Sequence, residues 1–197
     1  YLRKWGFTPQ KPKKKAYEQC PKKVQKWLDE EYPAIQQRAK LEDAEIQWAD
    51  ETGVRNNCQH GRSYAPKGKT PTKFSMSKKF SVNMISSLTN QGKVQFMIYS
   101  ENMNSDRLIL FLKQLIKESP KKVFLILDNL RVHHSNLVKD WVKENKEKIE
   151  LFFLPAYSPE KNPDEYLNCD LKQGLSNKPA PKNKEKLKEN LENHMQM

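Results

Sequence analysis

The stretch Val123–Asp128 reads Val-Phe-Leu-Ile-Leu-Asp and is the segment that decides the fold of this chain. Five consecutive apolar residues, rich in branched and aromatic side chains, are typical of a central strand that is buried on both faces of a sheet. The carboxylate that ends the run is costly to bury unless a cation pairs with it. We therefore expect a central strand at residues 123–127, with Asp128 at its carboxyl end.

Around this stretch, apolar periodicity predicts further strands and helices in an ordered series. The expected strands are 45–49, 79–88, 93–100, 123–127 and 149–154, and the expected helices are 106–118 and 135–146. Another helix should begin at Asn162, because Asn162–Glu165 combines an N-cap residue, a proline at the first helical position and a glutamate at the third. A hairpin followed by alternating helices and strands predicts an α/β fold, with a mixed sheet of about five strands flanked by helices.

The two ends of the chain differ in composition from this central part, which we place at residues 44–175. Residues 1–43 are predicted to be a basic linker and a helical, partly extended appendage, in which Pro33 separates two helical stretches. Residues 176–197 are predicted to be a tail rich in Lys, Asn and Glu that contains one short amphipathic helix, 184–195. The chain is expected to be a piece of a longer protein, because it does not begin with Met.

The charge of the chain favours a polyanionic partner. Lys and Arg number 36 and Asp and Glu 24, which gives a net charge of +12. Such an excess favours nucleic acid, although a well-solvated lysine-rich surface is the alternative. No run of about 18 apolar residues predicts a membrane span. The three cysteines are scattered, which favours a reducing compartment, and Cys58 and His60 lack the spacing of a zinc site.

Three carboxylates are the candidate catalytic and metal-binding residues. Asp50 and Asp128 each end an expected strand, and Glu165 lies at the start of an expected helix. Singly, each has a plain structural explanation: a turn after Asp50, an Asx turn at Asp128 and Asn129, and a capping box for Glu165. Together they predict an all-oxygen site for two Mg²⁺ or Mn²⁺ ions and phosphodiester chemistry.

Other polar residues are weaker candidates. Asn129 and His133 follow the second aspartate, where they are auxiliary candidates for orienting water, a ligand or a phosphate, although a histidine at a helix entrance is more often structural. Solvated surface is equally plausible for the candidate DNA-binding residues, which are Arg62, Lys67, Lys69, Lys73, Lys13 and Lys14.

The chain resembles the mariner-type DDE transposases, in particular their bacterial insertion-sequence branch. The stretches that carry the resemblance are Trp48–Gly53, Gly61–Pro71, Leu127–Ser135 and Leu154–Glu165, in that order. The resemblance implies a ribonuclease-H-like catalytic domain with Asp50, Asp128 and Glu165 as its metal triad. It further implies hydrolysis at transposon ends with Mg²⁺ or Mn²⁺, transfer of the freed 3′-hydroxyl into target DNA, a homodimer on DNA, and a location in the bacterial cytoplasm at the nucleoid.

A departure from the family leaves alternatives open. Transposases of this type carry a helix-turn-helix module before the catalytic domain, and this chain is expected to begin at the link between the two. A truncated remnant that binds DNA or pairs with full-length subunits as an inhibitor is the second interpretation. A cellular ribonuclease-H-type nuclease is the third, disfavoured by the stretch Gly61–Pro71 and by the lack of an obvious fourth carboxylate.

Overall fold

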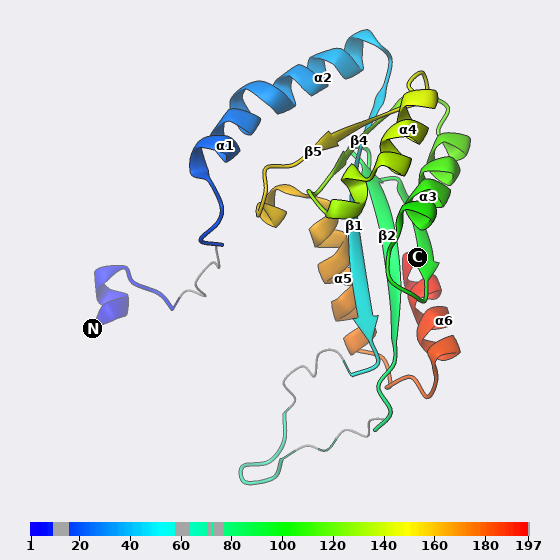
Figure 1. Cartoon of the computed structure of the whole chain (residues 1–197). Helices are drawn as coiled ribbons and strands as arrows, with labels where there is room; N and C mark the ends of the chain where they lie inside the picture. Colours follow the sequence, from blue (N-terminus) through cyan, green and yellow to red (C-terminus); the bar gives the residue numbers. More distant parts are fainter. Residues whose placement is uncertain (10–15, 58–63, 71, 73–76, 197) are drawn as a thin grey trace.

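A five-stranded mixed sheet forms the centre of the computed structural model, which describes residues 1–9, 16–57, 64–70, 72 and 77–196 (Figure 1). The strands are β1 (Glu45–Arg55), β2 (Ser81–Thr89), β3 (Val94–Tyr99), β4 (Val123–Leu127) and β5 (Ile149–Phe153). Their order is β3-β2-β1-β4-β5. The first three strands are antiparallel neighbours, and β4 and β5 run parallel to β1. The predicted α/β fold with a mixed sheet of about five strands is confirmed.

The central strand β1 is longer than the sequence predicts. The expectation that it ends before Asp50 is wrong, because the strand continues to Arg55. Its parallel pairing with β4 stops at Trp48 and Ile126, but its antiparallel pairing with β2 continues through Asp50 and Ser86 to its end. Thr52 and Val54 bury their side chains, which keeps the segment extended. Asp50 therefore lies inside β1, beside the end of β4.

One face of the sheet is covered by two helices, α3 (Ser105–Glu118) and α4 (Asn136–Glu144). Four apolar residues of α3 and one of α4 pack on this face in a single cluster; they are Leu108, Phe111, Leu112, Leu115 and Val138. Ser135 caps α4 by accepting a hydrogen bond from the backbone N–H of Val138. Asn104 caps α3, and its side chain accepts a hydrogen bond from the backbone N–H of Arg107. Together, α3 and α4 bury the first face of the sheet.

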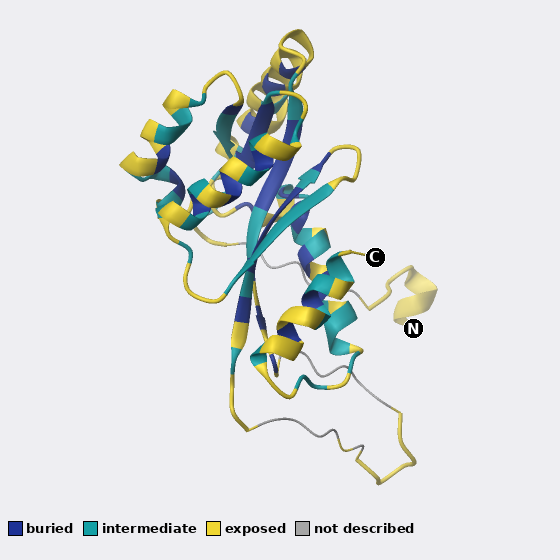
Figure 2. Cartoon of the chain, turned by 90° about the vertical axis from the view of Figure 1, so that its right-hand side faces the viewer, coloured by how far each residue is buried: buried dark blue, intermediate teal, exposed yellow. Residues whose placement is uncertain are grey.

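The opposite face is covered in two separate parts, as Figures 1 and 2 show. At one end, apolar residues of the N-terminal helical run pack on Trp48, Phe124 and Ile126. At the other end, α5 (Asp164–Ser176) and α6 (Lys184–Met195) pack on Val54, Val82 and Met84. Because side chains alternate along a strand, Asp50 falls on this face between Trp48 and Val54. The two coverings therefore leave an interval at Asp50.

The N-terminal helical run passes through Pro33 without a break, contrary to the sequence prediction. It consists of α1 (Pro21–Lys26), the π-helical segment η2 (Trp27–Glu31) and α2 (Tyr32–Leu41). Proline in a helix lacks the N–H of the usual i→i−4 hydrogen bond, and here the π-helical turn precedes it, with the N–H of Tyr32 bonded to the carbonyl of Trp27. The rings of Trp27, Tyr32 and Trp48 pack together at centroid separations of 5.1–5.9 Å.

Short 3-10 segments and α6 complete the described structure. The 3-10 segments are η1 (Leu2–Trp5), η3 (Arg131–His134) and η4 (Pro159–Lys161). The helix predicted at residues 184–195 is present as α6, and its Leu187 and Leu191 are buried against α5 and β2. None of the helices in the described part of the chain is long and apolar enough to cross a membrane.

Truncating the buried face of α6 tests whether this helix unfolds together with the sheet. Leu191 is fully buried, so Leu191→Ala should lower the free energy of unfolding by about 2–5 kcal/mol in urea denaturation. Leu137→Ala is the matched control, because Leu137 is 61% exposed and its loss should change stability by less than about 0.5 kcal/mol. Equal unfolding midpoints for the two variants would mean that α6 unfolds independently of the sheet.

Candidate active site

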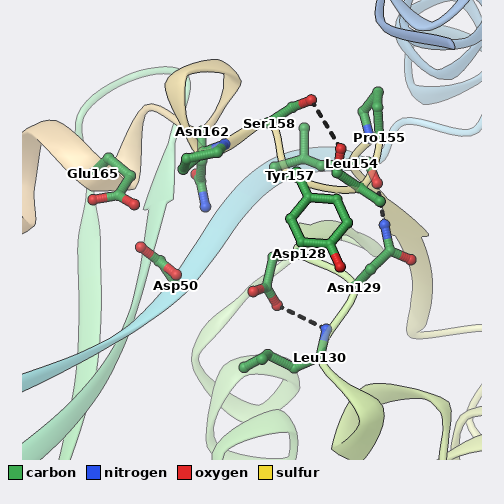
Figure 3. A pocket seen from close by; sticks show the side chains of 12 residues that line it. Asp50, Asp128, Asn129, Leu130, Leu154, Pro155, Tyr157, Ser158, Asn162 and Glu165 are labelled. Atoms are coloured by element: carbon green, nitrogen blue, oxygen red, sulfur yellow. Dashed lines mark hydrogen bonds between the residues drawn. The ribbon is translucent and has the colours of Figure 1, made fainter. Parts of the chain in front are cut away.

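Three carboxylates from distant parts of the chain line one cleft of about 400 Å³ (Figure 3). Asp50 comes from the middle of β1, Asp128 directly follows β4, and Glu165 lies in the first turn of α5. The loop that connects β5 to α5 forms the remaining wall. The cleft opens where the two coverings of the sheet leave Asp50 accessible. The structure thus brings together the three residues that the sequence proposes as catalytic.

The electrostatics of Asp50 indicate a site with unbalanced negative charge. Burial, the negative charge of Glu165 and that of Asp128 raise the pKa of Asp50 to about 7. Hydrogen bonds from the backbone of Glu51 and from Asn168 offset part of this increase. Within the described residues, no lysine or arginine forms an ion pair with Asp50 or Glu165. A cation bound in the cleft would relieve this repulsion.

The donor set fits a hard divalent cation. All three side chains offer carboxylate oxygens, which Mg²⁺ and Mn²⁺ prefer over nitrogen and sulfur ligands. Across the part of the chain that the structure describes, no group of three His, Cys, Asp or Glu side chains is arranged as a ready-made metal cluster. The carboxylates are therefore of the right chemistry for a metal but do not converge on one point.

A fourth carboxylate, Asp164, lies behind Asp50, although the sequence shows no obvious fourth carboxylate. Asp164 is fully buried; its Oδ2 accepts a hydrogen bond from the Ser86 hydroxyl at 2.7 Å, but its Oδ1 has no partner. Burial raises the pKa of Asp164 to about 7; the Ser86 hydrogen bond opposes this, and the charges of Asp50 and Glu165 add to it. Asp164 does not line the cleft, so it adds negative charge behind the site without reaching its surface.

Two asparagines fix α5 and the carboxylates relative to β1. Asn162 donates from Nδ2 to the carbonyl of Ala49 at 3.0 Å and accepts the backbone N–H of Asp164 at 3.1 Å. The helix begins at Asp164, two residues later than predicted, with Asn162 preceding it. Asn168 donates from Nδ2 to Oδ2 of Asp50 at 2.9 Å. The spacing of Asp164, Asn168 and Leu171 is the signal that would have revealed this buried helical face.

His133 links Asp128 to the opposite face of the sheet. Its side chain is buried; Nδ1 lies 3.2 Å from Oδ1 of Asp128, and Nε2 lies 3.3 Å from Oε1 of Glu51. Burial lowers the pKa of His133, but hydrogen bonds with Asp128 and Glu51 outweigh it and raise the pKa to about 9. The hydroxyl of Tyr99 also bonds to Glu51, and burial together with the charge of Glu51 raises the pKa of Tyr99 above its usual range.

The auxiliary candidates therefore act on protein groups. His133 does not line the cleft, and its ring contacts carboxylates rather than the space that a substrate would occupy. Asn129 lines the cleft, but its Nδ2 donates to the carbonyl of Leu154 and its Oδ1 lies 3.2 Å from Nε2 of His134. Both residues hold the segment after β4 in place. Glu51 was not predicted, and no pattern in the sequence distinguishes it from the other charged residues of β1.

The candidate DNA-binding residues are only partly described. Lys67 and Lys69 are exposed and lie outside the cleft. Four candidates, Arg62, Lys73, Lys13 and Lys14, lie outside the described residues, as do Cys58 and His60.

The raised pKa values predict an unusual dependence of stability on pH in metal-free protein. Asp50 and Asp164 have pKa values raised from 3.8 to about 7 in the folded state. Between these values the folded chain binds more protons than the unfolded chain, so the free energy of unfolding falls as pH rises from about 4 to 7. Asp164→Asn removes one such group and should raise the free energy of unfolding at pH 8 by on the order of 2 kcal/mol.

Urea denaturation at pH 5 and pH 8, with divalent ions removed, measures this effect. The matched control is Asp140→Asn, which changes an exposed aspartate on α4 and should follow the wild type at both pH values. An Asp164→Asn variant that loses stability at pH 8 would contradict the assignment of a destabilising buried charge.

Comparisons with known proteins bear on the family and the fold of this chain. A family model described as winged helix-turn-helix matches residues 1–31, where the sequence predicts a linker and a helical appendage rather than part of such a module. None of the curated proteins has a sequence that matches this chain. Among solved structures, the paired-end complex of Mos1 transposase with the left transposon end has a TM-score of 0.71 at 19% identity, over 99% of this chain and 61% of that chain.

Two further Mos1 structures give the same result. The mariner paired-end complex with Mn has a TM-score of 0.73 at 18% identity, over 99% of this chain and 61% of that chain. The catalytic domain alone has a TM-score of 0.63 at 17% identity, over 95% of this chain and 85% of that chain. The chain thus spans about three fifths of the Mos1 chains in the complexes. At these identities the likeness establishes the fold, which is the ribonuclease-H-like fold of the Mos1 catalytic domain.

The match to a family model covers most of the chain. The model of the DDE superfamily endonucleases matches residues 45–188, which include all five strands and the three carboxylates of the cleft. The chain therefore belongs to the DDE superfamily endonuclease family.

Proposed function

We propose that this chain is the catalytic part of a mariner-type DNA transposase of the bacterial insertion-sequence branch. It would hydrolyse phosphodiester bonds at transposon ends and join the freed 3′-hydroxyl to target DNA. The observation that carries the proposal is that Asp50, Asp128 and Glu165 line one cleft, where burial and the charges of Glu165 and Asp128 raise the pKa of Asp50. Carboxylates in such an unbalanced arrangement are suited to divalent cations.

The fold supports this proposal. The similar structures include Mos1 transposase bound to transposon ends and determined with Mn or with Mg. By analogy, the partners of this chain are transposon-end and target DNA, it acts as a homodimer on DNA, and it works in the cytoplasm at the bacterial nucleoid. Residues 44–175 would be the catalytic domain. Because α6 packs on α5 and β2, the tail at 176–197 would support that domain.

The residues in and around the cleft would have two kinds of role, as metal ligands and as residues that orient those ligands. Asp50, Asp128 and Glu165 would hold two Mg²⁺ or Mn²⁺ ions, which supply water activation and stabilisation of the leaving oxygen. Asn168 orients the carboxylate of Asp50, and the ring of His133 orients that of Asp128.

DNA binding would depend on exposed basic residues. Exposed lysines such as Lys67 and Lys69 would neutralise phosphates and keep the DNA strand at the cleft.

Asp164 removes one argument against the alternative of a ribonuclease-H-type nuclease, because it is a fourth carboxylate near the site. However, it is buried behind the cleft, and the family match is to DDE endonucleases. A truncated remnant that acts as an inhibitor is the alternative that applies if the chain neither binds metal nor cleaves DNA.

Metal binding tests the assignment of the triad. Calorimetric titration of Mn²⁺ into the full chain should detect binding, and Asp50→Asn and Asp128→Asn should each weaken it by more than about ten-fold. Mutating a residue that only orients a metal ligand already lowers metal affinity by about ten-fold or more, and these variants change the ligands themselves. The same two variants should lose Mn²⁺-dependent nicking of supercoiled DNA. Asp140→Asn is the matched control, since this aspartate is exposed on α4 outside the cleft.

The outcomes of this experiment separate the alternatives. An Asp128→Asn variant that nicks DNA like the wild type would exclude Asp128 from the metal site. A wild-type chain that binds DNA but neither binds Mn²⁺ nor nicks DNA would favour the inhibitory remnant.

The salt dependence of DNA binding tests the contribution of the lysines. Each phosphate contact adds about 0.9 to the slope of log K against log salt for duplex DNA. Replacing both Lys67 and Lys69 with Ala should therefore reduce the slope by up to about 2. Lys139→Ala, which changes an exposed lysine on α4, should leave the slope unchanged. Equal slopes for the wild type and the double variant would place both lysines away from the bound phosphates.

A further inference from the structure

The cleft has two walls of different chemistry. The carboxylates Asp50, Asp128 and Glu165 form one wall, and the loop between β5 and α5 forms the other. That loop contributes mainly apolar side chains, which are those of Leu154, Pro155, Ala156, Tyr157 and Pro159. Leu130, in the segment after β4, also lines the cleft. The carboxylates suit a phosphate held through cations, but they do not account for an apolar surface directly beside them.

Tyr157 is the most unusual residue of the apolar wall. Tyr157 is 59% exposed although it lines the cleft, and Figure 3 shows its ring projecting into the cleft that Asp128 also lines. Its φ is +59°, in the left-handed region that residues other than glycine and asparagine rarely adopt. Such a conformation costs about 1 kcal/mol or more and occurs preferentially at functional sites.

The surrounding structure holds Tyr157 in this conformation at three points. Asn129 donates to the carbonyl of Leu154 at the start of the loop, and Asn162 donates to the carbonyl of Ala49 at its end. Between these anchors, Nε2 of Gln19 lies 3.0 Å from the carbonyl of Tyr157 and 3.1 Å from the hydroxyl of Ser158. The loop is therefore fastened to β1, to the segment after β4 and to the N-terminal segment, and the ring is presented from a rigid base.

We propose that Tyr157 is a stacking platform for one nucleobase of the DNA strand whose phosphate lies at the carboxylates. The inference rests on the proposed function, because it takes the occupant of the cleft to be DNA. A nucleotide carries a charged phosphate and a flat apolar base, which match the two walls of the cleft. Stacking on an aromatic ring accepts any base, because every base has a π-face. The base that stacks on Tyr157 has one face that no neighbouring base covers, as at a cleaved end or in an unpaired nucleotide.

A comparison of two oligonucleotides with identical phosphates isolates the stacking. Anisotropy titrations would measure the Kd of the full chain for a labelled thymidine 20-mer and for an abasic 20-mer, in Ca²⁺ in place of Mg²⁺. In the wild type the thymidine strand should bind more tightly. Tyr157→Ala should reduce this preference by about ten-fold, the typical value of one base–aromatic stack. Tyr157→Phe, which keeps the ring, should retain the preference.

Two further variants keep the test decisive. Tyr166→Ala is the matched control, because Tyr166 is a 79% exposed tyrosine on α5 that does not line the cleft, and it should retain the preference for bases. Tyr157→Gly removes the ring and relieves the left-handed strain, so its melting temperature should equal or exceed that of the wild type while the preference falls. Loss of the preference in a variant that is fully folded assigns the effect to the ring.

The possible results also separate this inference from the proposed function. A Tyr157→Ala variant with an unchanged preference for thymidine over the abasic strand would overturn the platform, even if the wild type nicks DNA with Mn²⁺. A wild type that does not nick DNA, but whose base preference depends on Tyr157, would overturn the proposed chemistry and keep the platform.

Discussion

The pairing of β1 with two neighbours of opposite direction is the constraint on which the rest of the structure depends. Parallel pairing with β4 ends at Trp48 and Ile126, while antiparallel pairing with β2 continues through Asp50. Asp50 therefore lies beside Asp128, the residue that follows β4, although the two are 78 positions apart (128 − 50). A slip of one residue in β1 would move Asp50 to the other face and bring Glu51 to the cleft. The site therefore requires this register.

The alternation of side chains along β1 also explains how Asp128 is held. Asp50 points to the face that carries the cleft, and Glu51 points to the face covered by α3 and α4. His133 connects Glu51 to Asp128, so a buried imidazole with a pKa raised to about 9 lies between a carboxylate of β1 and the carboxylate that follows β4. No comparable cation pairs with Asp50, Asp164 or Glu165 among the described residues. The chain thus neutralises one part of the site itself and leaves the other part for an external cation.

The sequence was sufficient for the elements whose residues are uniformly apolar or regularly spaced. The central strand at residues 123–127 and the helix at 184–195 follow from pattern alone. It failed where tertiary packing overrides local preference: Gly53 suggests a turn after Asp50, but pairing with β2 keeps the strand extended. Pro33 suggests a break, but a π-helical turn precedes it. Asp164 and Glu51 were missed. The spacing of Asp164, Asn168 and Leu171 marks one face of a helix, but only tertiary packing determines that this face and Glu51 are covered.

The placement of Glu165 depends on packing far from the cleft. Sheet pairing positions both aspartates, but Glu165 is carried by a helix, and only the contacts of that helix determine where its first turn lies. Asn162 ties the start of α5 to β1, and Leu171 anchors its buried face in the cluster that Leu187 and Leu191 of α6 complete. Without α6 this face of α5 would lose its apolar cover. The C-terminal helix is therefore connected to the chemistry of the cleft, although it contributes no residue to its walls.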